Sequence, residues 1–184
     1  MRIASKLESI TQIEKLGLNK FPEQLFKANE YRKVQEFLKR YPAKYYAIRD
    51  KSKAGGVFKL KVEASDVIKE IQEYSLFTIN VSSANYVENQ MLVGEIQILS
   101  SNEVYLIVSQ DPAASVRDAL RNPSFNLKTD IFDKKLNKIP HFDFLYEYIS
   151  SHGLYDVIVE FALFNTKLGM NKEKIVIYEL RTDY

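Results

Sequence analysis

Apolar residues recur every three or four positions in several parts of the chain, which is the pattern of an amphipathic helix with one buried face. Three of these segments end at a residue that breaks helices. Gly17 ends the first, Pro42 follows the second and Gly153 follows the last. Ser65 stands where it can cap a shorter helix. The helices predicted in this way are residues 5–18, 29–40, 66–74, 112–120 and 142–151.

Other segments are uniformly apolar or alternate between apolar and polar residues, as strands do. Ser101 and Asn102 stand between two such segments and predict a hairpin. We expect a turn at 53–56, a loop over 169–174 and a polar, irregular stretch over 124–140. The predicted strands are 45–48, 57–62, 76–81, 91–99, 103–108, 157–164 and 175–180.

The connections between these strands are short, which favours antiparallel pairing, and the helices flank the strands. The expected fold class is therefore α+β, with a mostly antiparallel sheet flanked by helices. A length of 184 residues suits a single domain. That domain would span 1–184, either undivided or as two small lobes of about 1–86 and 87–184.

Composition narrows the classes of function. The 26 basic and 24 acidic residues are interspersed and leave a formal net charge of +2, which argues against a nucleic-acid-binding protein. The absence of cysteine excludes disulfides and thiolate chemistry, and two histidines cannot form a multi-histidine metal site. No apolar run reaches the roughly 18 residues that span a membrane, and residues 1–10 do not resemble a secretory signal. We therefore expect a cytoplasmic protein with no nucleic-acid or membrane partner.

Two basic residues stand where they suit phosphate binding. Lys6 lies at the start of the first predicted helix, where backbone N–H groups favour anions. The alternative is a solvated surface lysine on an amphipathic helix. Arg49 follows the strand 45–48, and an anchored guanidinium can offer a planar fork to phosphate oxygens. Lys51 and Lys53 add positive charge nearby. The alternative for Arg49 is a salt bridge beside an ordinary turn.

Glu160 and Glu179 each interrupt an apolar run in one of the last two predicted strands. On an antiparallel pair they could face the same side and share a divalent ion. Magnesium uses carboxylates together with phosphate oxygens and water, so two glutamates are sufficient protein ligands. The alternative is that both point to solvent, but a glutamate among apolar neighbours such as Val159 and Phe161 needs a partner if it is buried.

Five short motifs along the chain occur in an order that is found in a known family. They are Ser5–Leu18, Tyr45–Ser52, Val87–Val93, Tyr155–Ala162 and Ile175–Arg181. This order resembles the N-terminal nucleotide-binding domain of the phosphoenolpyruvate synthase and pyruvate phosphate dikinase family, which is of the ATP-grasp type.

The resemblance implies that the ligands are ATP and Mg²⁺. Lys6 and Arg49 would contact the phosphates of the nucleotide. Glu160 and Glu179 would hold Mg²⁺. Arg181 would contact the phosphoryl group in transfer, so that Arg49 and Arg181 would be the catalytic residues.

The resemblance also implies a residue that reads the edge of the adenine ring. Glu88 and Gln90, which precede the predicted strand 91–99, are the first candidates, and Glu95 is a third. The register of the motif leaves the choice among them open.

The chain departs from the family in several places. Ala4 and Ser5 replace two glycines, Thr182 replaces a proline, and the segment before Arg49 is shorter. We expect the phosphohistidine and pyruvate-binding domains to be absent, so the acceptor would be another protein or a small molecule. The hypotheses are an ATP-dependent phosphotransferase or ligase-like enzyme, a non-catalytic nucleotide-binding module, and an interaction domain of phage or mobile-element type.

Overall fold

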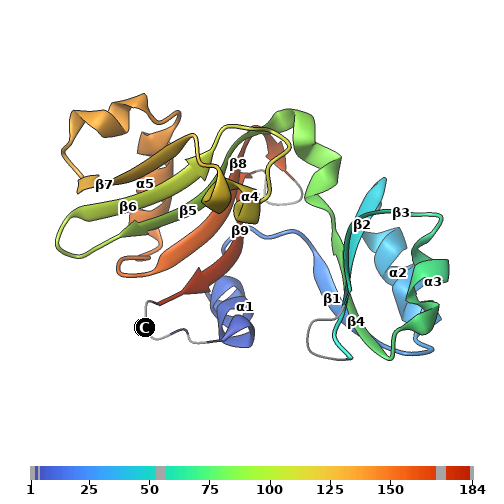
Figure 1. Ribbon diagram of the computed structural model, residues 1–184. Helices are drawn as coiled ribbons and strands as arrows, with labels where there is room; N and C mark the ends of the chain where they lie inside the picture. Colours follow the sequence, from blue (N-terminus) through green and yellow to red (C-terminus); the bar gives the residue numbers. More distant parts are fainter. Residues whose placement is uncertain (1–2, 4, 53–56, 169–172, 183–184) are drawn as a thin grey trace. The chain divides into compact units, whose positions relative to one another are not determined.

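The computed structural model describes residues 3, 5–52, 57–168 and 173–182. The chain divides into two compact units (Figure 1). The smaller unit is Phe21–Val87, and the larger unit joins Met1–Lys20 to Glu88–Tyr184. Each unit has its own antiparallel sheet and its own hydrophobic core. None of the helices formed by the described residues is long and apolar enough to cross a membrane.

The smaller unit is a four-stranded antiparallel sheet with helices on one face. Its strands lie in the order β1-β4-β2-β3. Phe26, Ile48 and Phe77 point from the sheet to the helices and are buried there with Phe37 of α2. The elements are β1 (Glu23–Lys27), α2 (Tyr31–Arg40), β2 (Tyr45–Asp50), β3 (Phe58–Glu63), α3 (Val67–Glu70), the 3-10 helix η1 (Ile71–Glu73) and β4 (Leu76–Val81).

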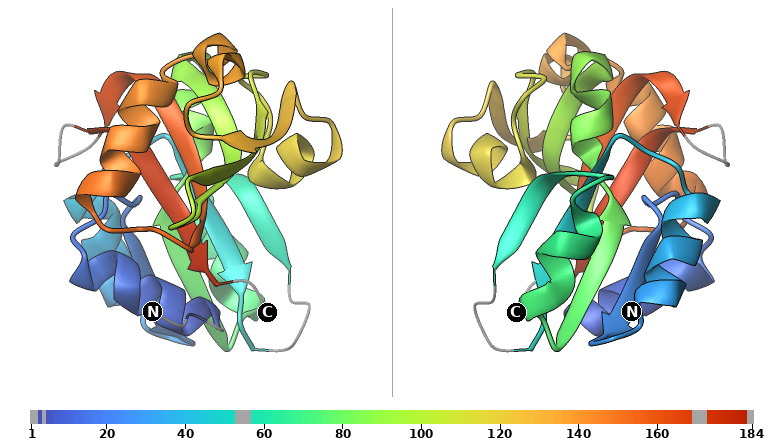
Figure 2. Two further views of the ribbon diagram at one scale, coloured as in Figure 1. Left: turned by 90° about the vertical axis from the view of Figure 1, so that its left-hand side faces the viewer. Right: turned by 90° about the vertical axis from the view of Figure 1, so that its right-hand side faces the viewer.

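The larger unit is a five-stranded antiparallel sheet in the order β7-β6-β5-β8-β9. Helix α5 covers one face of the sheet (Figure 2) and buries Leu145 and Ile149 against Ile96 and Val159. The 3-10 helix η2 (Ser83–Asn89) leads from β4 into this unit. The remaining elements are α1 (Lys6–Lys15), β5 (Gln90–Ile98), β6 (Glu103–Ser109), α4 (Val116–Arg121), β7 (Phe125–Asp130), the 3-10 helix η3 (Lys134–Lys138), α5 (Phe142–Ser151), β8 (Ile158–Leu168) and β9 (Glu173–Arg181).

Helix α1 belongs to the larger unit because its segment is hydrogen-bonded to β9. The backbone N–H of Leu180 donates to Ser9 Oγ at 2.7 Å. Asn19 Nδ2 donates to the carbonyl oxygen of Ile175 at 2.7 Å. Ser9 and Asn19 are buried polar residues, and these bonds satisfy them. The first twenty residues are therefore tied to the last strand of the fold.

The structure confirms the α+β fold class and the predominance of antiparallel pairing. Each predicted strand is present, and Ser101 and Asn102 form the hairpin turn, with Asn102 in the left-handed region. The predicted helices 5–18, 29–40 and 142–151 are also confirmed. The turn at 53–56 and residues 169–172 of the predicted loop lie outside the described residues.

Several expectations about the elements were wrong. Strand β1 was not predicted, because Phe26 is its only buried residue and one apolar position carries no periodicity. The stretch 124–140 is not irregular, since it holds β7 and η3; β7 is an edge strand whose inward side chains are only half-buried. The predicted helix 66–74 is a short α3 followed by η1.

The two short helices also begin at other residues than expected. Ser65 does not cap α3, because the N-cap position is Asp66 and its side chain makes no capping bond. Helix α4 starts at Val116 rather than near Pro112. Ser115 caps it through a reciprocal pair of bonds with Asp118.

Candidate functional site

Three glutamates form a row across three neighbouring strands of the larger unit, β5, β8 and the edge strand β9. Glu95 on β5 lies directly opposite Glu160 on β8, and Glu160 lies directly opposite Glu179 on β9. Directly opposed residues on neighbouring strands point to the same face of a sheet. The three side chains, called the carboxylate row below, therefore share one face. The cross-strand pairing predicted for Glu160 and Glu179 is confirmed.

A bulge in β9 sets the direction of the last of these side chains. Glu160 pairs with Glu179, but the next residue, Phe161, pairs with Ile177, so that Tyr178 is the extra residue of β9. Ile177 and Leu180 both lie in the core although they are three residues apart. The bulge thus changes the phase of alternation, and Glu179 faces the same side as Glu160 instead of the core.

Arg181 lies among the carboxylates. It follows Glu179 by two residues and faces the same side. Its Nη1 donates to Glu160 Oε1 at 2.6 Å, and its Nη2 donates to Glu95 Oε1 at 2.6 Å. The side chains of Arg181, Glu160 and Glu95 are 26%, 18% and 11% exposed, so these are short, largely buried charge-assisted bonds.

The charges around Arg181 stabilise its protonated form. Burial by itself would lower the pKa of the guanidinium. The hydrogen bond and the charge of Glu95, with the charges of Glu160 and Glu179, outweigh that effect and raise the pKa above its usual value. Arg181 therefore stays protonated and carries a permanent positive charge in a row of three carboxylates.

The carboxylate row offers a metal two ligands rather than three. Neighbouring strands lie about 4.8 Å apart, so the ends of a row over three strands are separated by roughly 10 Å. In agreement, no group of three or more His, Cys, Asp or Glu side chains among the described residues is arranged to hold a metal ion. The adjacent pair Glu160 and Glu179 has the chemistry that Mg²⁺ needs when phosphate oxygens complete its shell. One oxygen of Glu160 already accepts a bond from Arg181.

Arg49 lies on β2 of the smaller unit, opposite Thr78 of β4 and Phe58 of β3. Its guanidinium carbon lies 4.7 Å from the centre of the Phe58 ring. Both neighbours of Arg49 along the strand, Ile48 and Asp50, are buried on the helix-covered face, so Arg49 points to the other face. The strand anchors Arg49 as expected, and its guanidinium stacks on an aromatic ring.

Lys6 is the first residue of α1, but its side chain lies outside the described part of the chain. The start of this helix is capped by Ser5 and Glu8. Ser5 Oγ accepts from the Glu8 N–H at 3.2 Å, and Glu8 Oε2 accepts from the Ser5 N–H at 3.2 Å. Side chains of the helix itself therefore accept hydrogen bonds from two of the backbone N–H groups at its positive end.

The three residues considered for adenine recognition have different surroundings. Glu88 is exposed in η2. The amide nitrogen of Gln90 donates to the carbonyl oxygens of Ala114 at 2.8 Å and Pro112 at 3.1 Å, which holds the segment before α4. Glu95 bonds Arg181. The contact between Glu95 and Arg181 was not predicted from the sequence. It depends on the order and register of β5, β8 and β9, which bring a side chain of β9 within reach of one on β5.

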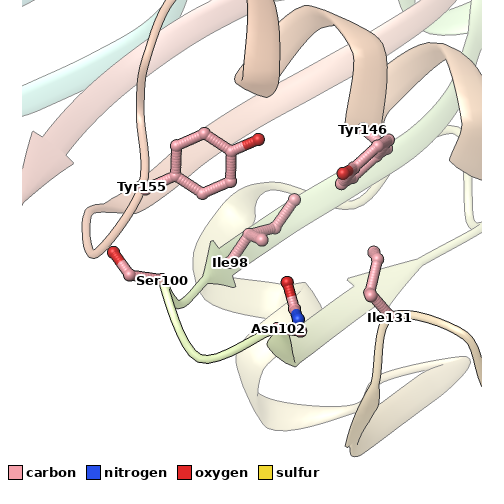
Figure 3. Close-up of a pocket in the computed structure, with 6 residues that line it drawn as sticks. All are labelled: Ile98, Ser100, Asn102, Ile131, Tyr146 and Tyr155. Atoms are coloured by element: carbon pink, nitrogen blue, oxygen red, sulfur yellow. The ribbon is translucent and has the colours of Figure 1, made fainter.

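A cavity of about 300 Å³ lies elsewhere in the larger unit. Figure 3 shows Tyr146 of α5, Tyr155 and Ile131 around it, with Ile98, Ser100 and Asn102 at the turn between β5 and β6. Ile98 and Glu95 are three residues apart on β5, so they point to opposite faces of the sheet. The cavity is therefore on the α5 side, and none of the residues predicted from the sequence lines it.

Comparison with known proteins identifies the fold. No protein-family model matches the chain, and no curated protein matches its sequence. Among solved structures, an N5-carboxyaminoimidazole synthetase from Staphylococcus aureus has a TM-score of 0.51 at 12% identity over 97% of this chain and 44% of that one. The same enzyme complexed with ADP has a TM-score of 0.50 at 13% identity, over 97% and 43% of the two chains.

The macrocyclase MdnC from Microcystis aeruginosa MRC, bound with precursor peptide MdnA, has a TM-score of 0.50 at 15% identity over 95% of this chain and 51% of that one. The chain thus spans about half the length of the structures it matches. These are ATP-grasp enzymes, and the ATP-grasp-like fold expected for this chain is confirmed.

Proposed function

We propose that this chain binds ATP with Mg²⁺ and positions the phosphates for transfer to an acceptor. The carboxylate row with Arg181, on the sheet of an ATP-grasp-like fold, carries the proposal. A structure of the same fold at 13% identity is described as complexed with ADP, which supports a nucleotide as the ligand. The resemblance of the motifs to the dikinase domain supports the same ligand.

The proposal gives each charged residue one task. Glu160 and Glu179 would hold Mg²⁺, which supplies the charge that neutralises phosphate oxygens. Arg181 would donate to the phosphoryl group, and Arg49 and Lys6 would donate to the other phosphates. Glu88 or Gln90 would contact the adenine. Catalysis would then consist of positioning and charge neutralisation, with another protein or a small molecule as the acceptor.

A second function is favoured by two contacts. Arg181 is bonded to Glu95 and Glu160, and the start of α1 is capped by Ser5 and Glu8. In both arrangements, groups that could bind phosphate are already hydrogen-bonded to carboxylates or hydroxyls of the chain itself. A non-catalytic nucleotide-binding or protein-interaction module would have this property, and it would bind ATP without turning it over.

Thermal unfolding with and without Mg²⁺ and ATP tests nucleotide binding. A ligand that binds only the folded protein stabilises it by about 2.7 kcal/mol at a hundred times its dissociation constant. We expect the unfolding midpoint to rise for the wild type and not for Glu179→Gln. Glu179 is the right position because the bonds of Arg181 to Glu160 and Glu95 do not involve it, so the substitution leaves both intact.

Glu147→Gln is the matched control, since Glu147 is an exposed residue of α5 on the same unit. It is expected to keep the full ligand-induced shift. The absence of any shift in the wild type at millimolar Mg²⁺ and ATP would refute nucleotide binding. Release of ADP or phosphate by the wild type would separate the enzyme from the non-catalytic module.

A further inference from the structure

Arg181 lies between two carboxylates of the row, Glu95 and Glu160. Its two terminal nitrogens donate at 2.6 Å to Glu95 and to Glu160, and the three side chains are at most about a quarter exposed. A planar guanidinium is suited to two carboxylates or to phosphate oxygens, because its donors form a rigid fork.

We propose that Arg181 is an internal cation that withholds Glu160 from divalent metal until the phosphates of a nucleotide draw the guanidinium away. This inference rests on the proposed function for the identity of the ligand. It goes further in stating that metal and nucleotide bind cooperatively, and that Glu95 is a positioning residue for Arg181.

Competition for Glu160 is the physical basis of this coupling. A metal ion that used Glu160 while Arg181 remained bonded there would lie next to a second positive charge, and such repulsion is strong at a largely buried site. Phosphate oxygens accept guanidinium bonds as well as carboxylates do. When Arg181 turns to a phosphate, Glu160 Oε1 no longer accepts a bond from the guanidinium, and the repulsion between Arg181 and a metal ion falls.

Glu95 determines where the guanidinium rests in the absence of nucleotide. It is the most buried of the three glutamates in the carboxylate row and lies on the strand next to β8. Because Arg181 spans β8 to reach it, the guanidinium is held over Glu160 rather than over Glu179.

The test is a titration of the protein with Mn²⁺ alone, in the absence of nucleotide, followed by the signal of free Mn²⁺ in electron paramagnetic resonance. We expect Arg181→Gln to bind Mn²⁺ roughly tenfold more tightly than the wild type, within the usual range of coupling between two ligands. Arg181→Lys keeps the charge but cannot form the fork, so an intermediate affinity is expected. Arg121→Gln, at an exposed position of α4, is the matched control and should bind Mn²⁺ as the wild type does.

Arg181→Lys also protects the test against a folding defect, because the lysine leaves a cation beside buried Glu95. Equal or weaker Mn²⁺ binding by the folded variants than by the wild type would overturn the proposal. Nucleotide binding by the wild type is measured separately, from the shift of its thermal unfolding midpoint with Mg²⁺ and ATP. If the variants bind Mn²⁺ more tightly but the wild type binds no nucleotide, the proposed function is refuted and the competition of Arg181 with metal stands. If the wild type binds nucleotide but the variants bind Mn²⁺ no more tightly, only the competition of Arg181 with metal is refuted.

Discussion

Replacing Gly94 by alanine tests the close approach of two strands beside the carboxylate row. Gly94 precedes Glu95 on β5, and its φ is +154°. An added Cβ would lie 2.1 Å from the carbonyl oxygen of Ile107 and 2.8 Å from the Cα of Val108, whereas real Cβ contacts essentially never fall under 3.0 Å. Both atoms belong to the backbone of β6, so no side-chain rotation can relieve the contact.

The cost follows from these distances. The strands must separate by about 0.9 Å to bring the shortest contact from 2.1 to 3.0 Å. Overpacking of this kind costs about 1–3 kcal/mol, and the unfavourable φ adds about 1–3 kcal/mol. We therefore expect a loss of about 2–6 kcal/mol, which lowers the unfolding midpoint of a chain of this size by roughly 4–24 °C.

Thermal unfolding followed by circular dichroism measures this loss. Gly153→Ala is the matched control, because Gly153 also has a positive φ of +63° but an added Cβ there meets nothing within 4 Å. It should cost about 1–2 kcal/mol, which comes from the left-handed φ alone. If Gly94→Ala unfolded at the wild-type temperature, or at that of Gly153→Ala, the reasoning from the strand contact would be refuted.

Three further substitutions test contacts that hold the larger unit together. Gln90→Ala removes the bonds that hold residues 111–114, so we expect a loss of about 1–2 kcal/mol and faster hydrogen exchange in that segment; unchanged exchange would contradict this role. Ser9→Ala leaves a buried N–H of β9 without its acceptor and should cost about 1–3 kcal/mol in urea unfolding, unless the N–H finds another partner. Hydrogen bonds from Ser100, chiefly from its hydroxyl and to a lesser extent from its N–H, lower the pKa of Asp156 in the folded state. The carboxylate therefore stabilises the fold above its unfolded pKa of about 3.9, and this stabilisation is lost as the pH falls through the lower folded pKa. Asp156→Asn should therefore weaken the dependence of the midpoint on acid, and an identical acid transition in both proteins would rule this out.

The sequence by itself determined the elements with long, regular patterns. Helices α2 and α5 bury residues at helical spacing, and strands β4, β5, β6, β8 and β9 are apolar runs or alternate between apolar and polar residues. Local patterns of these kinds are visible without the fold. It also placed Glu160 and Glu179 on neighbouring strands, because the connection between them is short. Strand β1 and the edge strand β7 escaped because few of their residues are buried.

Only the tertiary structure decided how the charged residues meet. The extra residue Tyr178 turns Glu179 to the side of Glu160, and a bulge leaves no mark in an apolar pattern. Arg181 reaches Glu95, which precedes it by 86 positions, because β8 brings their strands together. The bond between Ser9 and β9 likewise joins the two ends of the chain. Such contacts depend on strand order and register, which arise from the packing of the whole unit and not from the residues near each position.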